Sequence, residues 1–345
     1  MGIKYNISKA KSSLFFSLKR KILSHKKLRK MTNYFRTYVL HPNDREQKKS
    51  FGNENPDKTI YIIRYPSNNG SGVMSLFFLT LQQIDIAERE GYIPVVDMKN
   101  SKTQYYNGKD NAWEIWFSQP DIVSLESAYM SRNVILSGFS KKQREIPDIW
   151  KKTIVEENDP DGSFRMNPEF INYIHTLIEK HVSFGESILK LVNLGEEMVN
   201  PEGCIGVLAR GTDYTILQPP GELVQPSPDQ IVKKINEYDE LYGKKDIFLV
   251  TEDFTIFTYF EEKFGNRLKR VSFDILVKDY DGRDYLSRTG AFKDPISSCS
   301  VYIAKLLLLS KCRYFIGGLT SGTKLSFVMN NNQYEDSFVF YLGQY

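Results

Sequence analysis

The sequence predicts an α/β protein with two Rossmann-like lobes and a basic N-terminal arm. The chain has 345 residues, two to three times the usual length of one domain. Short apolar runs alternate with segments of helical periodicity, which is typical of parallel sheets covered by helices. The first 49 residues hold 14 Lys or Arg against two acidic residues, while the whole chain has a net charge of only +4. A basic arm therefore precedes an acidic globular body.

These patterns divide the chain into three predicted segments. Residues 1–58 form the basic arm and end in a polar stretch, 43–58, that we interpret as a linker. Residues 59–195 form the first Rossmann-like domain, and residues 196–345 form the second.

The first domain begins with a βαβ unit. A β-rich run at 59–63 precedes a helical pattern at 73–90 and a short apolar run at 92–97, as expected for two buried parallel strands joined by a helix. A further strand is expected at 133–136. A segment of helical periodicity at 167–194 is expected to bridge the two domains.

The second domain alternates more regularly between strands and helices. Strands are expected at 204–208, 246–250, 268–272, 313–316 and 337–341. Helices are expected at 229–241, 254–264, 299–309 and 323–330, with a charged loop at 278–293. Ligands of such sheets bind beyond the carboxyl ends of the strands, so the loops there are candidate sites.

The basic arm predicts an anionic partner. Residues 1–50 interleave apolar side chains such as Phe15 and Phe16 with lysines, as in a helix lying on anionic lipid. A solvated, flexible tail is an equally good interpretation. No recognisable reader domain supports nucleic-acid binding, so we expect no nucleic acid.

Cysteine content and hydropathy favour a cytoplasmic protein. The three cysteines, Cys204, Cys299 and Cys312, are odd in number and lack the spacing of a zinc site. No apolar run reaches the roughly 18 residues that span a bilayer, and the first apolar cluster is too short for a signal peptide. The arm would allow a peripheral position on the inner face of the membrane.

Polar residues directly follow two of the predicted strands. Arg210 and Asp213 come after the strand at 204–208, where a guanidinium fork would suit a pyrophosphate; the alternative is an Arg–Asp pair that closes a surface turn. Glu252 and Asp253 come after the strand at 246–250, where they would accept hydrogen bonds from a ribose or base. Thr251 or Asp253 would otherwise cap the following helix.

A third loop, at 317–324, joins a strand to a helix and is rich in small residues. Its backbone amides and hydroxyls, at Thr320, Ser321 and Gly322, would form an anion site at the helix N-terminus, or only a tight turn. The interval from Gly317 to Gly322 matches the P-loop, but Thr323 stands where that motif has Lys, which argues against an NTPase.

Taken together, these three loops resemble the fucosyltransferase superfamily, which includes α-1,6-fucosyltransferases, nodulation fucosyltransferases and protein O-fucosyltransferases. The resemblance covers roughly 59–341 by organisation, and by motif only at the loops. It rests on an Arg-x-x-Asp loop, a Thr-Asp-Asp-like loop and a late Thr-Ser loop, and on an N-terminal glycine loop at 68–72. The family usually has His and a second Arg where this chain has Leu208 and Gly211.

The resemblance implies a GT-B-like fold and an inverting, metal-independent transfer of a sugar, fucose first, from a GDP-sugar. The acceptor would bind the first domain and the donor the second, with no cofactor and no metal. Arg210 and Asp213 would be the catalytic residues, with Arg210 on the β-phosphate. The implied donor-binding residues are Gly70, Gly72, Arg210, Thr251, Glu252, Asp253, Thr320, Ser321, Gly322 and Thr323.

The acceptor would be a glycan or lipid-linked glycan of surface-polysaccharide or glycoconjugate assembly. Tyr105, Trp113 and Trp116 would stack on its sugar faces, although aromatic rings more often belong to a core. Glu222, Asp281 and Asp284 remain open as candidate bases. The rival hypothesis is a non-catalytic nucleotide- or glycan-binding protein on the same scaffold.

Overall fold

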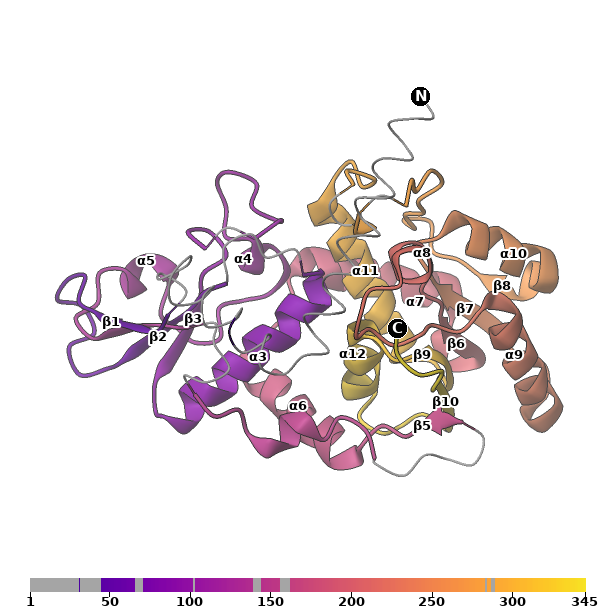
Figure 1. The fold of residues 1–345 in the computed structure, drawn as a ribbon, viewed down its shortest axis with the longest axis horizontal. Helices are drawn as coiled ribbons and strands as arrows, with labels where there is room; N and C mark the ends of the chain where they lie inside the picture. Colours follow the sequence, from indigo (N-terminus) through magenta and orange to yellow (C-terminus); the bar gives the residue numbers. More distant parts are fainter. Residues whose placement is uncertain are drawn as a thin grey trace. The chain divides into compact units, whose positions relative to one another are not determined.

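The computed structural model describes residues 31, 45–65, 71–101, 103–138, 144–155, 162–282, 284–286 and 289–345 (Figure 1). The chain forms two compact units. The N-terminal unit comprises the described residues up to Lys151 together with Tyr173–Gly185, and the C-terminal unit comprises Lys152–Asn172 and Glu186–Tyr345. Most of the basic arm lies outside the described residues.

A four-stranded sheet organises the N-terminal unit, in the order β1-β4-β2-β3. Its strands are β1 (Gln47–Lys49), β2 (Ile60–Ile63), β3 (Ile93–Val96) and β4 (Val134–Leu136). Strand β2 runs parallel to β3 and β4, and helix α3 (Val73–Arg89) joins β2 to β3. The βαβ unit expected from the sequence is therefore present, because its apolar runs are long enough to fix both strands and the helix between them.

Strand β1 corrects the expected linker at 43–58. It pairs antiparallel with β4 at the edge of the sheet, with Gln47 opposite Leu136 and Lys49 opposite Val134. An exposed edge strand of polar residues carries no apolar pattern, so hydrophobic periodicity does not reveal it. The remaining elements of this unit are short: α4 (Ala112–Trp116), α5 (Leu125–Ala128) and the 3₁₀ turn η3 (Asp148–Lys151).

A six-stranded sheet organises the C-terminal unit, in the order β5-β10-β9-β6-β7-β8. The strands are β5 (Ser163–Phe164), β6 (Cys204–Leu208), β7 (Asp246–Val250), β8 (Leu268–Lys269), β9 (Tyr314–Gly318) and β10 (Asp336–Phe340). All pairs are parallel except β5 with β10. The two-lobed α/β class predicted from the sequence is confirmed.

Helices connect these strands. They are α7 (Glu186–Val199), α8 (Asp213–Leu217), α9 (Pro228–Tyr242), α10 (Phe254–Phe264), α11 (Pro295–Leu309) and α12 (Ser321–Asn330), with 3₁₀ turns η4 (Pro201–Gly203) and η5 (Gly265–Arg267). The helical segment expected at 167–194 is two helices, because α6 (Pro168–His181) ends before α7 begins; the first residues of α6 belong to the C-terminal unit and the rest to the N-terminal unit.

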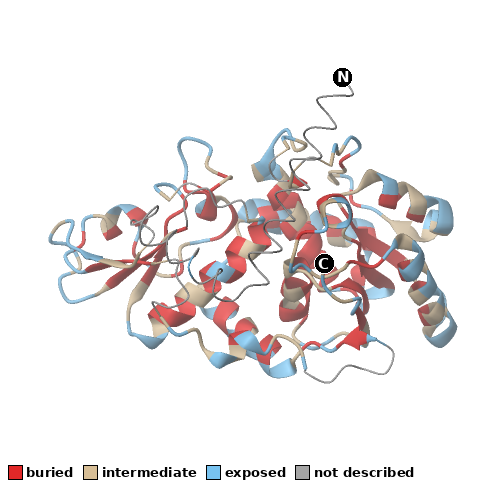
Figure 2. Ribbon diagram, viewed as in Figure 1, coloured by how far each residue is buried: buried red, intermediate tan, exposed pale blue. Residues whose placement is uncertain are grey.

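The buried residues lie along the sheets and on the helix faces packed against them (Figure 2). Strands β6 and β9 are buried throughout, as expected for central parallel strands. Side-chain caps fix where several helices begin; Ser227 caps α9, Asp253 caps α10, Asp294 caps α11 and Thr320 caps α12. Within the described part of the chain, no helix has the length and apolar content to cross a membrane.

Candidate functional site

Three loops follow neighbouring parallel strands of the C-terminal unit. Strands β9, β6 and β7 are adjacent, and Leu208 at the end of β6 lies opposite Gly317 of β9 and Val250 of β7. Because the strands are parallel and in register, the loops that follow them leave the sheet at one edge. The structure thus brings together the three loops that the sequence singled out.

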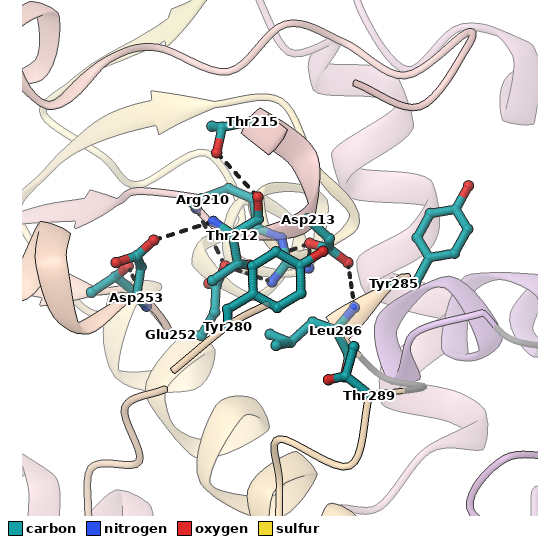
Figure 3. Close-up of polar contacts among 12 residues, drawn as sticks. Arg210, Thr212, Asp213, Thr215, Glu252, Asp253, Tyr280, Tyr285, Leu286 and Thr289 are labelled. Atoms are coloured by element: carbon teal, nitrogen blue, oxygen red, sulfur yellow. Dashed lines mark hydrogen bonds and ion pairs between the residues drawn. The ribbon is translucent and has the colours of Figure 1, made fainter. Parts of the chain in front are cut away.

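The first loop presents a guanidinium held between two carboxylates (Figure 3). Nη2 of Arg210 donates to Oδ1 of Asp213 at 2.9 Å, and Nη1 lies 3.2 Å from Oε1 of Glu252. The guanidinium also lies over the ring of Tyr214, 4.9 Å from its centroid. Burial opposes the charge, but Glu252 and Asp213 outweigh it and raise the pKa of Arg210. The side chain is 23% exposed, so a ligand has access to it.

The same two carboxylates fix the backbone around Arg210. Oδ2 of Asp213 accepts a hydrogen bond from the amide of Leu286 at 3.0 Å. Oε1 of Glu252 accepts from the hydroxyl of Thr212 at 2.8 Å and from the amide of Gly211 at 3.3 Å. The guanidinium is therefore oriented by groups that are themselves held in place.

Asp253 caps a helix and anchors the Arg210 loop at the same time. Its Oδ1 accepts from the amides of Thr255 and Ile256, at 2.8 and 3.2 Å, which caps α10. Its Oδ2 accepts from the amide of Thr212 at 3.2 Å. The capping role foreseen as the alternative from the sequence is present, and a link between two of the loops accompanies it.

Close packing and backbone strain are concentrated at residues 211 and 212. A Cβ at Gly211 would lie 2.5 Å from Oδ2 of Asp253 and 2.8 Å from Cδ1 of Ile256, so a larger residue does not fit there without movement. Thr212 is buried and has φ 48° and ψ −117°, a conformation that β-branched residues rarely adopt. Strain of this kind persists where surrounding contacts impose it, and it is often found at functional sites.

The third loop uses its hydroxyls to start helix α12. The amide of Thr323 donates to Oγ1 of Thr320 at 3.2 Å, and the amide of Thr320 donates to Oγ1 of Thr323 at 3.1 Å. The Thr323 hydroxyl also donates to the carbonyl of Gly318. These contacts form a capping box, so the turn-before-helix alternative accounts for the side chains of both threonines.

Gly322 brings the third loop against helix α11. A Cβ at Gly322 would overlap the hydroxyl of Tyr302, so a larger residue there would displace that side chain. Burial raises the pKa of Tyr302, and the charge of Arg210 lowers it. The third loop therefore packs against Tyr302 of α11. Ser321, predicted as a donor-binding residue, is the first residue of α12.

A cavity of about 550 Å³ opens beside Arg210. Of the predicted site residues, Arg210 and Asp253 line it, together with the starts of α9 and α10. Gln225 and Ser227 are among the lining residues that the sequence analysis missed. The Ser-x-x-Gln capping signature of Ser227 and Gln230 was a usable signal for the helix start. Gln225 had no such signal, yet its Oε1 is buried without a partner among the described residues.

A buried ion pair lies behind the second loop. The ammonium of Lys305 pairs with the carboxylate of Asp274 and donates to the carbonyl of Thr251 at 3.1 Å. Both charged side chains are almost completely buried. The hydrogen bond ties α11 to Thr251, which follows β7, and the ion pair ties α11 to the segment after β8. No sequence motif indicated these roles.

The predicted glycine loop is only partly described. Gly70 lies outside the described residues. Gly72 is the N-cap of α3 in the N-terminal unit, with extended backbone and no side chain to cap the helix. Nothing in the described contacts of Gly72 assigns it a ligand.

The aromatic residues predicted to bind an acceptor lie in the core. Trp113 and Trp116 are fully buried and Tyr105 is 6% exposed. Trp113 stacks on Phe77 and donates its indole N–H to the carbonyl of Ser118 at 2.9 Å, while Tyr105 meets Trp116 edge to face. Buried rings offer no face to a sugar, so the core interpretation replaces the acceptor platform.

The candidate bases occupy two loops of the C-terminal unit. Burial raises the pKa of Tyr214, and the negative charge of Glu222 adds to this rise. The hydroxyl of Tyr280 donates to the backbone carbonyl of Asp284 at 2.7 Å. Burial raises the pKa of the same tyrosine, and the negative charges of Asp213 and Asp281 add to this rise. No cluster of three or more metal-ligating side chains occurs in the described ranges.

The site is therefore an oriented guanidinium beside a cavity, at the edge of the sheet in the C-terminal α/β unit.

No protein-family model matches the sequence, and no curated protein matches it. In fold the chain is similar to fucosyltransferases. One is the NodZ α-1,6-fucosyltransferase in a crystal soaked with GDP-fucose, with 15% identity, 79% of this chain and 93% of that chain covered, and a TM-score of 0.45.

Two further solved structures show the same likeness. The fucosyltransferase NodZ from Bradyrhizobium is 16% identical, with 78% of this chain and 93% of that chain covered and a TM-score of 0.44. A point mutant of Arabidopsis thaliana FUT1 in complex with GDP is 11% identical, with 83% and 71% covered and a TM-score of 0.43.

Proposed function

We propose that this protein is a glycosyltransferase that takes a sugar from a nucleoside-diphosphate sugar and transfers it to a glycan or glycolipid acceptor. A GDP-sugar, with fucose as the sugar, is the favoured donor, and the transfer is inverting and independent of metal. One observation carries the proposal: a half-buried guanidinium stands at the carboxyl edge of a parallel sheet, oriented by two carboxylates and open to a cavity.

The chemistry follows from the position of that charge. When the glycosidic bond of the donor breaks, negative charge builds up on the departing diphosphate. An oriented guanidinium stabilises this charge more than it stabilises the intact donor, which lowers the barrier. Asp213 and Glu252 position Arg210, and the amides at the start of α12 would support the same diphosphate. A carboxylate such as Glu222, or the leaving phosphate, would take the proton of the acceptor hydroxyl.

The first experiment identifies the donor. The full chain is screened by thermal shift with GDP, UDP, CDP, ADP and TDP, and the sugar form of the best ligand is then tested for hydrolysis or transfer by product analysis. Binding followed by turnover is expected. If none of these nucleotides binds, the proposal is wrong.

The second experiment tests Arg210 against a matched control. Arg210→Ala is expected to lower turnover by about 100-fold or more, because one stabilising donor at a developing charge contributes that much. The turnover of Arg210→Lys should lie between those of the unmodified chain and Arg210→Ala, since lysine keeps the charge but loses the paired N–H donors of the guanidinium. The control is Arg267→Ala: Arg267 is 26% exposed and pairs with Asp239, and it follows α10 instead of a strand end. Equal effects of Arg210→Ala and Arg267→Ala would refute a specific role.

A second candidate function has support from the same contacts. Both carboxylates that face Arg210 compete with a ligand for it. A non-catalytic nucleotide- or glycan-binding protein would show saturable binding of the nucleotide and no product with any sugar donor.

We also propose that the arm brings a cytoplasmic protein to the inner face of a membrane, in surface-polysaccharide or glycoconjugate assembly. The basic, apolar-interleaved sequence of residues 1–50 supports this. The test compares binding of the full chain and of a chain lacking residues 1–44 to liposomes of anionic lipid; the deletion stops there because β1 begins at Gln47. Equal binding of the two chains would exclude the arm as the anchor.

A further inference from the structure

The carboxamide of Gln225 uses only one of its two ends within the described part of the chain. The side chain is 6% exposed, and its Nε2 donates to the carbonyl of Leu223 at 3.1 Å. This bond fixes which end is the oxygen, because an oxygen in place of Nε2 would face another oxygen. Among the described residues, Oε1 has no hydrogen-bond partner. Since a buried oxygen without a donor costs stability, a ligand or a water is expected to supply one.

Gln225 belongs to the same cavity as Arg210. Both residues line it. A Cβ at Gly318, the last residue of β9, would overlap Oε1 of Gln225, so this oxygen lies against the backbone at the end of β9. Strand β9 neighbours β6, which Arg210 follows. The missing side chain at residue 318 therefore leaves room for the oxygen at the sheet edge that also presents the guanidinium.

The backbone on both sides of Gln225 is held in place. Before it, the amide of Val224 donates to the carbonyl of Gly343 at 3.0 Å. After it, Ser227 caps α9. The carboxamide is thus fixed at its backbone and at its Nε2, and a ligand that binds Oε1 has little ordering of this side chain to pay for.

Three other oxygen-bearing side chains of the cavity already accept hydrogen bonds from backbone amides. Oγ of Ser227 accepts from Gln230 at 3.2 Å, and Oε1 of Gln230 accepts from Ser227 at 2.9 Å. The two oxygens of Asp253 accept from amides of α10 and of the Arg210 loop. The guanidinium of Arg210 has donors only. The cavity therefore offers a cation for an anionic group and, in Gln225, an acceptor that no described residue uses.

We propose that Oε1 of Gln225 accepts a hydrogen bond from a hydroxyl or N–H group of the nucleotide sugar whose diphosphate binds Arg210. The inference rests on the function proposed above and adds a residue to its site. A nucleotide sugar carries such donors on its base, its ribose and its sugar, whereas its diphosphate supplies acceptors for the guanidinium. The two side chains thus recognise different parts of one ligand.

The test is isothermal titration of the full chain, first with the best-binding diphosphate among GDP, UDP, CDP, ADP and TDP and then with its sugar form. Gln225→Met keeps the length of the side chain and removes Oε1. The dissociation constant should rise by about 5- to 100-fold, because a donor of the ligand is left without its partner. A rise with both ligands places that donor on the nucleotide, and a rise with the sugar form alone places it on the sugar.

Gln119→Met is the matched control, because the Gln119 carboxamide uses both of its ends. It accepts from the amide of Val96 at 2.8 Å and donates to the carbonyl of the same residue at 3.0 Å. Gln119→Met should lower the Tm and leave both affinities unchanged, whereas Gln225→Met should lower affinity with a smaller change in Tm. Gly318→Ala provides a second variant: it keeps Gln225, displaces Oε1 and should also weaken binding.

Two results would overturn the inference and leave the proposed function standing. One is unchanged affinity for both ligands in Gln225→Met while Arg210→Ala loses binding, which would mean that a water is the partner of Oε1. The other is an equal loss of affinity in Gln225→Met and Gln119→Met, which would make the loss an effect of folding. If the unmodified chain binds no nucleoside diphosphate, the proposed function and this inference fail together.

Discussion

The backbone strain at Thr212 leads to a prediction about the order of stability of two variants. Thr212→Ala and Thr212→Gly both remove the hydroxyl that donates to Glu252 at 2.8 Å. They differ in one respect: alanine keeps a Cβ at φ 48° and ψ −117°, whereas glycine adopts that conformation without strain. The difference between the two variants therefore isolates the strain.

The magnitude follows from two opposing effects. A residue held in a rarely populated backbone region costs about 1–3 kcal/mol, which glycine recovers. Against this, glycine lowers the stability of the folded protein by about 0.5–1 kcal/mol relative to alanine, because it gives the unfolded chain more conformational freedom. Thr212→Gly should therefore be more stable than Thr212→Ala by about 1 kcal/mol. Both should be less stable than the unmodified chain, because the lost hydrogen bond to a buried carboxylate is worth about 1.5–3 kcal/mol.

Thr215 provides the matched control, three residues further along. It lies inside helix α8 with ordinary helical backbone, so glycine there should be less stable than alanine by about 1 kcal/mol. The assay is urea unfolding of the four variants, monitored by circular dichroism. The reasoning predicts opposite orders at the two positions. If glycine is the less stable residue at both, Thr212 is not strained in the folded protein.

Three further predictions concern stability and pH. Lys305→Met leaves the Asp274 carboxylate buried and unpaired and should cost about 3–5 kcal/mol in urea unfolding; a loss under 1 kcal/mol would contradict this. Trp113→Ala should cost about 3–5 kcal/mol by the same measurement, because Trp113 is fully buried in a ring cluster, and an unchanged midpoint would contradict its core role. Burial raises the pKa of Tyr65, so the phenol ionises in the unfolded chain near pH 10 while it stays protonated in the folded one. Stability should therefore fall as the pH rises above about 10, and the fall should be shallower in Tyr65→Phe.

Periodicity alone was enough to predict most of the C-terminal unit. The strands at 204–208 and 246–250 and the helix at 254–264 have the predicted bounds, since central strands are continuously apolar and Asp253 marks the helix start. Helix α11 begins four residues before the prediction, at Pro295, because its first turn is polar and its cap is Asp294. Short edge elements such as β1 have no apolar signal.

The site was predictable at the level of loops and not at the level of contacts. Arg210 and Asp253 could be singled out because each closely follows an apolar strand, and the loops that follow parallel strands lie at one edge of the sheet. The partners of those residues depend on tertiary packing. Nothing in the sequence distinguishes the buried Lys305 from a surface lysine, or foretells a positive φ at Thr212. Trp116 is the opposite case. The sequence analysis proposed it as an exposed acceptor-binding residue, but tertiary packing buries it completely.

The contacts within the Arg210 loop exceed what closing a turn would need. An Arg–Asp pair three residues apart is sufficient for that, and Asp213 supplies it. Glu252 comes from the next strand, carries a second contact to the guanidinium, and holds the strained Thr212 through its hydroxyl. Such a loop gives up stability to keep one side chain in a fixed orientation. A solvated turn does not require a fixed guanidinium, whereas the function proposed above does require one.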